Sequence, residues 1–305
     1  MDNLIPILAA AIAAGTPLVF AALGELITEK SGVLNLGVEG MMLVGAIAGF
    51  AVAAKTGNLW LGILAGMAAG ALMSGIFAVL ALNLMANQVA SGLALTLFGV
   101  GLSAFVGKPF ESVSLLNEGV VEVPLLSQIP GLGAVLFKHH FLVYVSWALF
   151  AGVSWFLYKS RAGLVLRSVG ESPESAHAIG YPVVRIRYLA TLFGGAMAGL
   201  GGAHLAEFYT PMWVEGMVAG RGWIALALVV FATWRPARVM VGAYLFGGVT
   251  IAQFFAQGAG VAVTAQLLSA LPYLATIIVL VFISRNINTI RLNSPVSLGK
   301  SYRPD

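Results

Sequence analysis

Residues 31–46, SGVLNLGVEGMMLVGA, are apolar and glycine-rich, and Ser31, Asn35 and Glu39 are the polar side chains that interrupt them. A carboxylate inside such a run is costly in a membrane and needs a partner or a water-filled cavity. We predict a helix over 37–54, which at about 1.5 Å per residue is long enough to cross the hydrocarbon core. Residues 31–36 would then be non-helical, as in a transmembrane helix that is broken.

Two roles for Glu39 stay open. In the first turn of a helix its charge is favoured by the helix N-terminus, which suits a capping role or pairing with another part of the bundle. Asn35 or Leu36 would then be the cap residue. The alternative is that Glu39 lines a path for a solute.

The composition defines the class of fold. Of 305 residues, 59% are hydrophobic and 9% are charged, and the mean hydropathy is +0.94. We therefore predict an all-α, polytopic membrane bundle of about eight to ten spanning or broken helices. The spans are expected near 4–24, 33–54, 59–82, 87–107, 140–158, 188–206, 220–234, 237–257 and 266–284. Residues 1–284 form one transmembrane domain that includes an inner loop, 159–187, and residues 285–305 form a polar tail.

The distribution of basic residues predicts the orientation. If the loop 159–187 is cytoplasmic, 12 of the 16 lysines and arginines fall inside and four fall outside: Lys55, Lys108, Lys138 and Arg221. The positive-inside rule then places the C-terminus in the cytoplasm. The basic residues flank apolar runs, so the sequence pI of about 9.4 does not indicate nucleic-acid binding.

Several kinds of chemistry are excluded by what the sequence lacks. There is no cysteine, and no phosphate-binding loop, H-E-x-x-H or G-x-S-x-G motif occurs. The four histidines form no cluster with acids, so no metal site is expected. We predict a protein that is not an enzyme and carries no cofactor of its own.

The inner loop contains a short helix with clear boundaries. Ser172 is a suitable N-cap and Pro173 suits the first helical position, while Gly180 ends the helix. Gly170 and Glu171 are expected in the preceding turn. The short helix, 173–179, suits either a docking element or a stable connector. The candidate coupling residues are Gly170, Glu171, Ser172, Pro173, Glu174, Ser175, Ala176, His177 and Gly180.

Three motifs carry a family resemblance. The spacing Glu174-Ser175-Ala176-x-x-x-Gly180 is similar to the E-A-A-x-x-x-G signature of permease subunits of ATP-binding-cassette (ABC) importers. The stretch 161–203 and the stretch 24–46, GELITEKSGVLNLGVEGMMLVGA, resemble the branched-chain amino acid, simple sugar and nucleoside permease family. Residues 86–102, ANQVASGLALTLFGVGL, resemble its nucleoside and simple-sugar branch. There is one departure from the family pattern. The apolar and proline positions expected farther after the family glycine, here Gly180, are not found at the expected distance, where Ala190 stands.

The resemblance implies a division of labour among several chains. An extracellular or periplasmic binding protein delivers the solute, two permease chains form the path, and two ATPase subunits bind ATP and Mg and drive transport. The helix 173–179 would fit a cleft on the ATPase, and the second permease would be a different chain. The chain would lie in the bacterial plasma membrane, and nucleosides are the preferred substrates, ahead of simple sugars such as ribose and branched-chain amino acids.

Two other classes of protein compete with this interpretation. An ion-coupled secondary transporter also uses broken helices, and it would need a coupling-ion site, for which Glu39 is the one intramembrane carboxylate expected. A structural membrane protein would not need the inner helix. Candidates for a substrate path are polar or aromatic side chains within the spans: Asn35, Glu39, Asn87, Gln88, Ser91, Phe98, His204 and Gln253.

Glycines recur at helical spacing in two of the predicted spans. Gly62, Gly66 and Gly70 are four residues apart, as are Gly195 and Gly199. Small residues at this spacing allow the backbones of membrane helices to approach closely. We interpret them as packing positions rather than as a specific gate.

Overall fold

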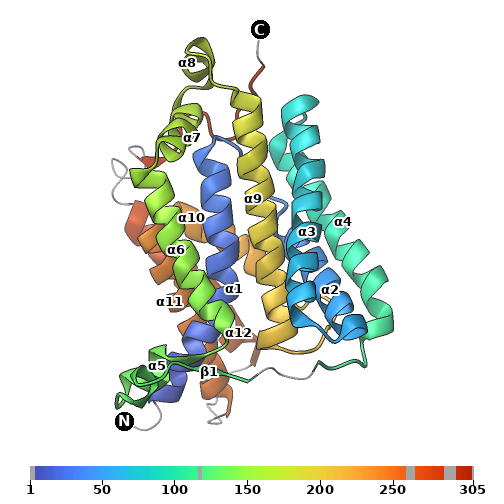
Figure 1. Cartoon of the computed structure of the whole chain (residues 1–305), viewed down its shortest axis with the longest axis vertical. Helices are drawn as coiled ribbons and strands as arrows, with labels where there is room; N and C mark the ends of the chain where they lie inside the picture. Colours follow the sequence, from blue (N-terminus) through green and yellow to red (C-terminus); the bar gives the residue numbers. More distant parts are fainter. Residues whose placement is uncertain (1–3, 116–118, 259–264, 285–292, 304–305) are drawn as a thin grey trace.

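The computed structural model describes residues 4–115, 119–258, 265–284 and 293–303. Long helices run along a common axis (Figure 1). These are α1 (Leu4–Lys30), α2 (Val38–Thr56), α3 (Leu59–Ala78), α4 (Gln88–Gly107), α6 (Phe141–Lys159), α9 (Val183–His204), α11 (Pro236–Gly258) and α12 (Ala265–Ser284). Two of them continue as π-helix, α3 through Val79–Asn83 and α9 through Leu205–Tyr209.

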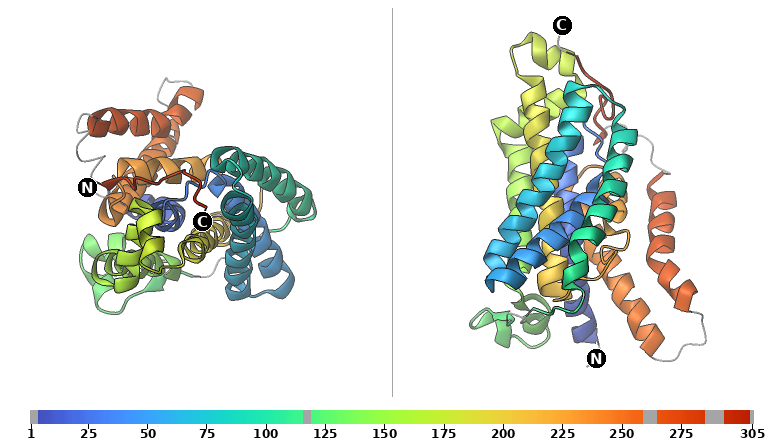
Figure 2. Two further views of the ribbon diagram at one scale, coloured as in Figure 1. Left: turned by 90° about the horizontal axis from the view of Figure 1, so that it is seen from above. Right: turned by 90° about the vertical axis from the view of Figure 1, so that its right-hand side faces the viewer.

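Shorter elements connect the long helices. The short α-helices are α5 (Leu132–Leu136), α7 (Arg161–Glu171), α8 (Pro173–Ala178) and α10 (Arg221–Phe231), and two 3₁₀ turns cover Lys108–Phe110 and Leu126–Gln128. Strand β1 (Val121–Glu122) pairs with β2 (Lys138–His139) in a two-stranded antiparallel sheet. Helix α8 and the C-terminal segment lie at one end of the bundle, here called the α8 end, and the N-terminus lies at the opposite end (Figures 1 and 2).

The predicted all-α membrane bundle is confirmed. Seven helices in the described part of the chain are long and apolar enough to cross a membrane, and α10 is a shorter apolar helix. Two differences from the predicted spans lie on either side of residues 31–37. Helix α1 continues to Lys30 instead of ending near residue 24, and α2 begins at Val38.

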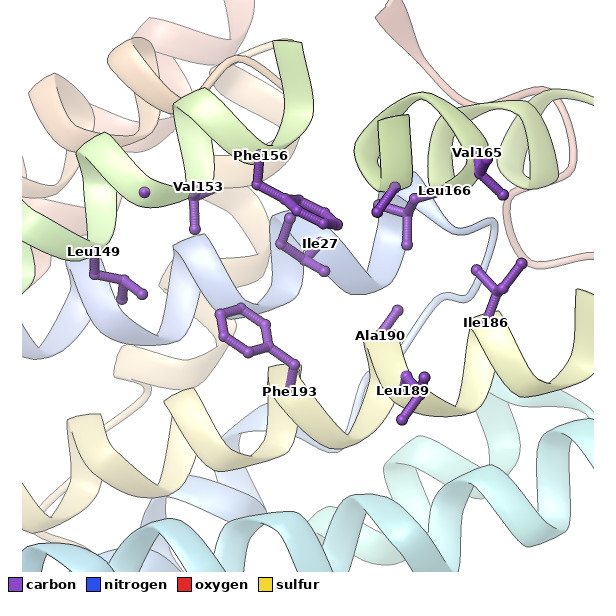
Figure 3. Close-up of a pocket in the computed structure, with 12 residues that line it drawn as sticks. Ile27, Leu149, Val153, Phe156, Val165, Leu166, Ile186, Leu189, Ala190 and Phe193 are labelled. Carbon is purple, nitrogen blue, oxygen red and sulfur yellow. The ribbon is translucent and has the colours of Figure 1, made fainter. Parts of the chain in front are cut away.

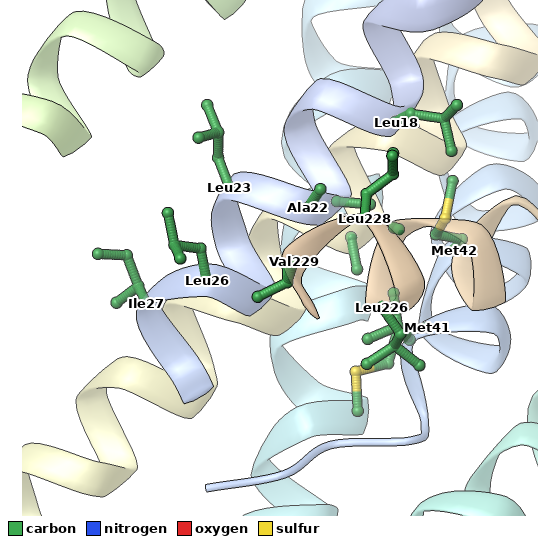
Figure 4. Packing of buried hydrophobic residues seen from close by; sticks show 14 of the residues in the cluster. Leu18, Ala22, Leu23, Leu26, Ile27, Met41, Met42, Leu226, Leu228 and Val229 are labelled. Carbon is green, nitrogen blue, oxygen red and sulfur yellow. The ribbon is translucent and has the colours of Figure 1, made fainter. Parts of the chain in front are cut away.

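The core of the bundle forms where α1, α2, α9 and α10 meet. Apolar side chains of α1, including Leu18 and Leu26, pack with Met41 and Met42 of α2 and with Val229 of α10 (Figure 4). All of these side chains are buried. The half-length helix α10 is therefore held inside the bundle by apolar contacts along its length.

Glycines let α2, α3 and α9 approach one another closely, as the glycine spacing predicted. A Cβ atom added at Gly199 would lie 2.2 Å from the carbonyl oxygen of Gly66, and one added at Gly45 would lie 2.4 Å from the Cα of Gly199. No side chain fits at such distances without moving a backbone. The three helices thus pack through backbone contacts, the mode available to helices in lipid.

We expect Gly199→Val to destabilise the protein, because overpacking of this kind costs about 1–3 kcal/mol. The matched control is Gly101→Val on α4, where no atom lies within 4 Å of the added Cβ. Tryptophan fluorescence during heating in detergent would give the unfolding midpoints. A midpoint for Gly199→Val equal to that of the control would contradict the close packing of α3 and α9.

Candidate functional site

Helices α7 and α8 form a compact unit at the α8 end. Ser172 caps α8, since its Oγ accepts a hydrogen bond from the backbone N–H of Ser175 at 3.2 Å. Pro173 is the first helical residue, and Gly180 follows the helix with a φ of +92°. The predicted turn at Gly170 and Glu171 is wrong. Both belong to the last turn of α7, because the N–H of Ser172 still donates to the carbonyl oxygen of Ser168 at 2.9 Å.

One face of α8 is buried and the other is exposed. Pro173 and Ala176 are buried, and Ala176 packs with Val169 and Val183. Glu174, Ser175, His177 and Gly180 are exposed. Ile179, just after α8, is 73% exposed. Helix α8 therefore projects from the end of the bundle, packs against it through Ala176 and leaves Ile179 exposed.

An apolar crevice of about 700 Å³ lies between α1, α6, α7 and α9 (Figure 3). Ile27, Phe156, Leu166 and Phe193 point into it, and its other lining residues are Leu149, Gly152, Val153, Ala162, Val165, Ile186, Leu189 and Ala190. These side chains carry no hydrogen-bond donor or acceptor. The crevice is unsuited to a solute rich in hydroxyl groups, although its size would admit one.

The chain between α1 and α2 is non-helical over residues 31–37, and polar side chains satisfy its backbone. The N–H of Leu34 donates to Gln88 Oε1 at 2.8 Å, and that of Asn35 donates to Glu25 Oε1 at 3.2 Å. Thr96 Oγ1 donates to the carbonyl oxygen of Leu36 at 3.0 Å. We call these seven residues the α1–α2 break; unlike a loop in water, it is buried almost throughout.

The start of α2 differs in detail from the prediction. The N-cap position is Gly37, and no side chain caps the helix. Asn35 Oδ1 instead accepts from the N–H of Gly37 at 2.9 Å, which closes a local turn before the helix. Glu39 lies in the first turn of α2, but its carboxylate does not bind its own helix.

Glu39 joins α2 to the start of α10. Its side chain is buried, and its two oxygens accept hydrogen bonds from the backbone N–H groups of Gly220 at 2.8 Å and Gly222 at 2.6 Å. The N-terminus of a helix has unpaired N–H groups and a partial positive charge, so a carboxylate is a suitable partner. Glu39 therefore caps α10 from a neighbouring helix.

We expect Glu39→Gln to destabilise the α2–α10 contact, because an amide has one acceptor oxygen where two N–H groups need acceptors. The loss is about 1–3 kcal/mol, the cost of leaving a buried donor unpaired. The control is Glu215→Gln, an exposed carboxylate in the segment before α10. The readout is the unfolding midpoint in detergent. If Glu39→Gln unfolds with the parental midpoint, the carboxylate does not hold α10.

The prediction that Glu39 is the one carboxylate within the spans is wrong. Glu25, Glu29 and Glu207 are also buried in helices. Glu29 Oε2 accepts a hydrogen bond from Trp234 Nε1 at 2.5 Å, which links the turn between α10 and α11 to α1. Glu207 lies against Gly49 of α2 and Gly62 of α3, and neither of its oxygens has a hydrogen-bond partner among the described residues.

A signal for two of these carboxylates exists in the sequence. Glu25 and Glu29 are four residues apart, with Leu26 and Ile27 between them, so they share one face of a helix that continues past residue 24. Counting about 20 residues for a span ended the predicted helix too early. Nothing in the sequence around Glu207 indicates burial.

The predicted path residues do not form one site. Asn35, Gln88 and Ser91 are buried near the α1–α2 break, with Glu39 at the start of α10. Asn87 is exposed and caps α4 by accepting from the N–H of Ala90 at 3.0 Å, while Phe98 is 54% exposed on α4.

His204 lies elsewhere, in a pocket of about 510 Å³ toward the opposite end of the bundle. Lys138, His139, His140 and Tyr209 also line this pocket, which makes it more polar than the crevice. Burial lowers the pKa of His139, whose ring contacts the carbonyl oxygen of Val135 at 2.7 Å. Gln253 is buried on α11, whose residue Ile251 also lines the pocket.

Helices broken within the bundle and a capped helix projecting from one end define a multi-pass membrane transport protein. The chain belongs to the family described as branched-chain amino acid transport system / permease component, whose sequence model matches residues 7–283. Proteins of this family are transport subunits, so the chain is a permease and not an enzyme.

Three curated relatives extend the comparison. A putative glucose ABC transporter permease protein of Haloferax volcanii is 42% identical over 97% of both chains. A nucleoside ABC transporter permease protein of Lactococcus lactis is 35% identical over 87% of this chain and 88% of its own length. A guanosine ABC transporter permease protein of Bacillus subtilis is 32% identical over 79% of both. Haloferax volcanii and Bacillus subtilis each have a second matching permease protein named for the same solute, at 25% and 26% identity.

Proposed function

We propose that the chain is the membrane-spanning subunit of an ATP-driven importer and that α8 docks on a separate ATPase subunit, which binds ATP and Mg. The observation that carries this proposal is α8, a capped helix that projects beyond the bundle (Figure 1) and is followed by the exposed Ile179. The relatives are named as ABC transporter permease proteins. The α8 end would then face the cytoplasm of a cell whose plasma membrane holds the protein.

A second, different permease chain and an external binding protein would complete the importer. Two relatives each come from an organism with a second permease protein named for the same solute. Two non-identical permeases around one path would account for such pairs. This supports a heterodimer over two copies of this chain.

ATP-driven closure of the ATPase pair would move α8 as a rigid lever. Helix α7 contacts α6 and α9, so a displacement of α8 would reach two spanning helices at once. Rigid-body movement of packed helices is the usual way in which such a change crosses a membrane protein. The exposed side chain of Ile179 would enter a cleft on the ATPase.

We expect Ile179→Asp to abolish co-purification of the ATPase, because a charged side chain replaces an exposed apolar anchor of the interface. Leu132→Asp is the control, since Leu132 is also well exposed but lies in α5, near the opposite end. The measurement is affinity capture of the ATPase from membranes that co-express both chains. Retention of the ATPase by Ile179→Asp at the level of Leu132→Asp would refute the docking role of α8.

The turn after α8 provides a second test. Gly180 has a φ of +92°, and the space beside it is open, so the backbone conformation alone restricts this position. We expect Gly180→Val to reduce transport and solute-stimulated ATP hydrolysis without preventing membrane insertion, while Gly180→Asn keeps most activity, because asparagine tolerates this conformation. Parental transport by Gly180→Val would contradict a rigid stop at this turn.

The proposed substrates are uncharged solutes that carry several hydroxyl groups, either simple sugars or nucleosides. The relative named for glucose is more similar over more of the chain, and two relatives named for nucleosides keep the predicted preference for nucleosides open. Uptake of labelled glucose, guanosine and leucine into proteoliposomes that contain the whole importer separates the classes. Uptake driven by a sodium or proton gradient without the ATPase would instead indicate a secondary transporter.

A further inference from the structure

The C-terminal segment, residues 293–303, is bound into the bundle although its sequence is that of a polar tail. The carbonyl oxygen of Asn293 accepts from Lys30 Nζ at 2.6 Å, and the N–H of Gly299 donates to the carbonyl oxygen of Gly32 at 3.1 Å. The N–H of Ser297 donates to the carbonyl oxygen of Gly170 at 3.0 Å. The segment thus touches the end of α1, the α1–α2 break and the end of α7.

Arg187 of α9 is at the centre of these contacts. Its side chain is 1% exposed, and its guanidinium donates to Ser31 O at 3.1 Å, to Ser297 Oγ at 3.0 Å and to Lys300 O at 3.3 Å. A buried arginine needs several acceptors, and the rigid fork of the guanidinium suits acceptors from different segments. This single side chain joins the break to the C-terminal segment.

Two glycines allow close approach here, Gly32 to the segment and Gly170 to the end of α1. A Cβ at Gly32 would lie 2.4 Å from Ser297 Oγ and 2.8 Å from Arg187 Nη2, and Gly32 has a φ of +91°. A Cβ at Gly170 would lie 2.2 Å from the carbonyl oxygen of Lys30. Gly170 was predicted to belong to the ATPase contact, but it is buried against the end of α1 and accepts from Ser297 Oγ at 2.6 Å.

The segment then reaches α8. The ring of Tyr302 packs on the cluster formed by Val169, Ala176 and Val183, and its centroid lies 6.3 Å from that of His177. The guanidinium of Arg187 lies 5.8 Å from the same ring, within the range of a cation–π contact. One continuous set of contacts therefore runs from α8 through Tyr302, Arg187 and Ser297 to the α1–α2 break.

We propose that the C-terminal segment and Arg187 form a second coupling element, which transmits the movement of α8 directly to the α1–α2 break at the start of α2. This inference rests on the proposed function, because α8 must meet an ATPase for its movement to matter. Arg187, Ser297 and Tyr302 are positioning residues, since they act by holding α8 and the break together. Helix α7 would pass the movement to α6 and α9, whereas this element acts directly on the α1–α2 break.

The experiment uses the complete importer in proteoliposomes and measures solute transported per ATP hydrolysed. We expect Ser297→Ala to lower this ratio by about tenfold, the factor for one lost hydrogen bond to a charged group. Tyr302→Ala should lower it by about fivefold, the factor for a lost cation–π contact. ATPase capture should stay parental, while the unfolding midpoint of Ser297→Ala should fall, because the buried guanidinium of Arg187 loses an acceptor. Ser301→Ala is the matched control, because Ser301 is exposed and lies in the same segment.

Arg187→Lys tests the central residue while keeping its charge. Lysine has no fork with which to reach three acceptors, so we expect the same fall in the transport ratio, with basal ATP hydrolysis unchanged. Parental ratios for Ser297→Ala, Tyr302→Ala and Arg187→Lys would overturn the proposal. A fall in the ratio that is equal in Ser301→Ala would also overturn it.

The two proposals fail in different ways. If Ile179→Asp still captures the ATPase, the proposed function fails first. If Ile179→Asp loses the ATPase but Ser297→Ala and Tyr302→Ala transport with the parental ratio, α8 docks as proposed and the C-terminal segment has no coupling role.

Discussion

The structure depends on satisfying the backbone of a chain that stops being helical inside the bundle. The α1–α2 break is buried almost throughout, so its N–H and C=O groups need hydrogen-bond partners from the protein. Gln88, Glu25 and Thr96 supply partners, and Arg187 binds the carbonyl oxygen of Ser31. Polar side chains within the spans, which look like a solute path in the sequence, serve this purpose first.

Helices α2 and α10 are linked by the same need for hydrogen-bond partners. Helix α10 begins at a partly buried turn, and Glu39 from the first turn of α2 accepts hydrogen bonds from the N–H groups of Gly220 and Gly222. At its other end, Trp234 donates to Glu29 of α1. Carboxylates that would be costly alone in lipid are thus paired with the donors that a broken helix exposes. Glu207 has no such donor among the described residues, and its carboxylate lies in the space beside Gly49 and Gly62.

Features that depend on neighbouring residues were predicted well. The apolar runs indicated the helical bundle, and Ser172, Pro173 and Gly180 bounded α8 to within one residue, because capping acts over one turn of helix. The extension of α1 through Glu25 and Glu29 was missed, since composition alone does not show that a charged turn is buried. The roles of Arg187 and Ser297 had no local signal, because their partners are more than 100 residues away in the chain.

The sequence by itself determined the membrane class, the approximate spans and the capped helix at the α8 end. These follow from the length of apolar runs and from hydrogen bonds within a few residues of each other. Only the tertiary structure decided which donor each buried carboxylate meets and where the C-terminal segment lies. Those partners are set by how α1, α2, α9 and α10 pack, which depends on contacts between residues far apart in the chain.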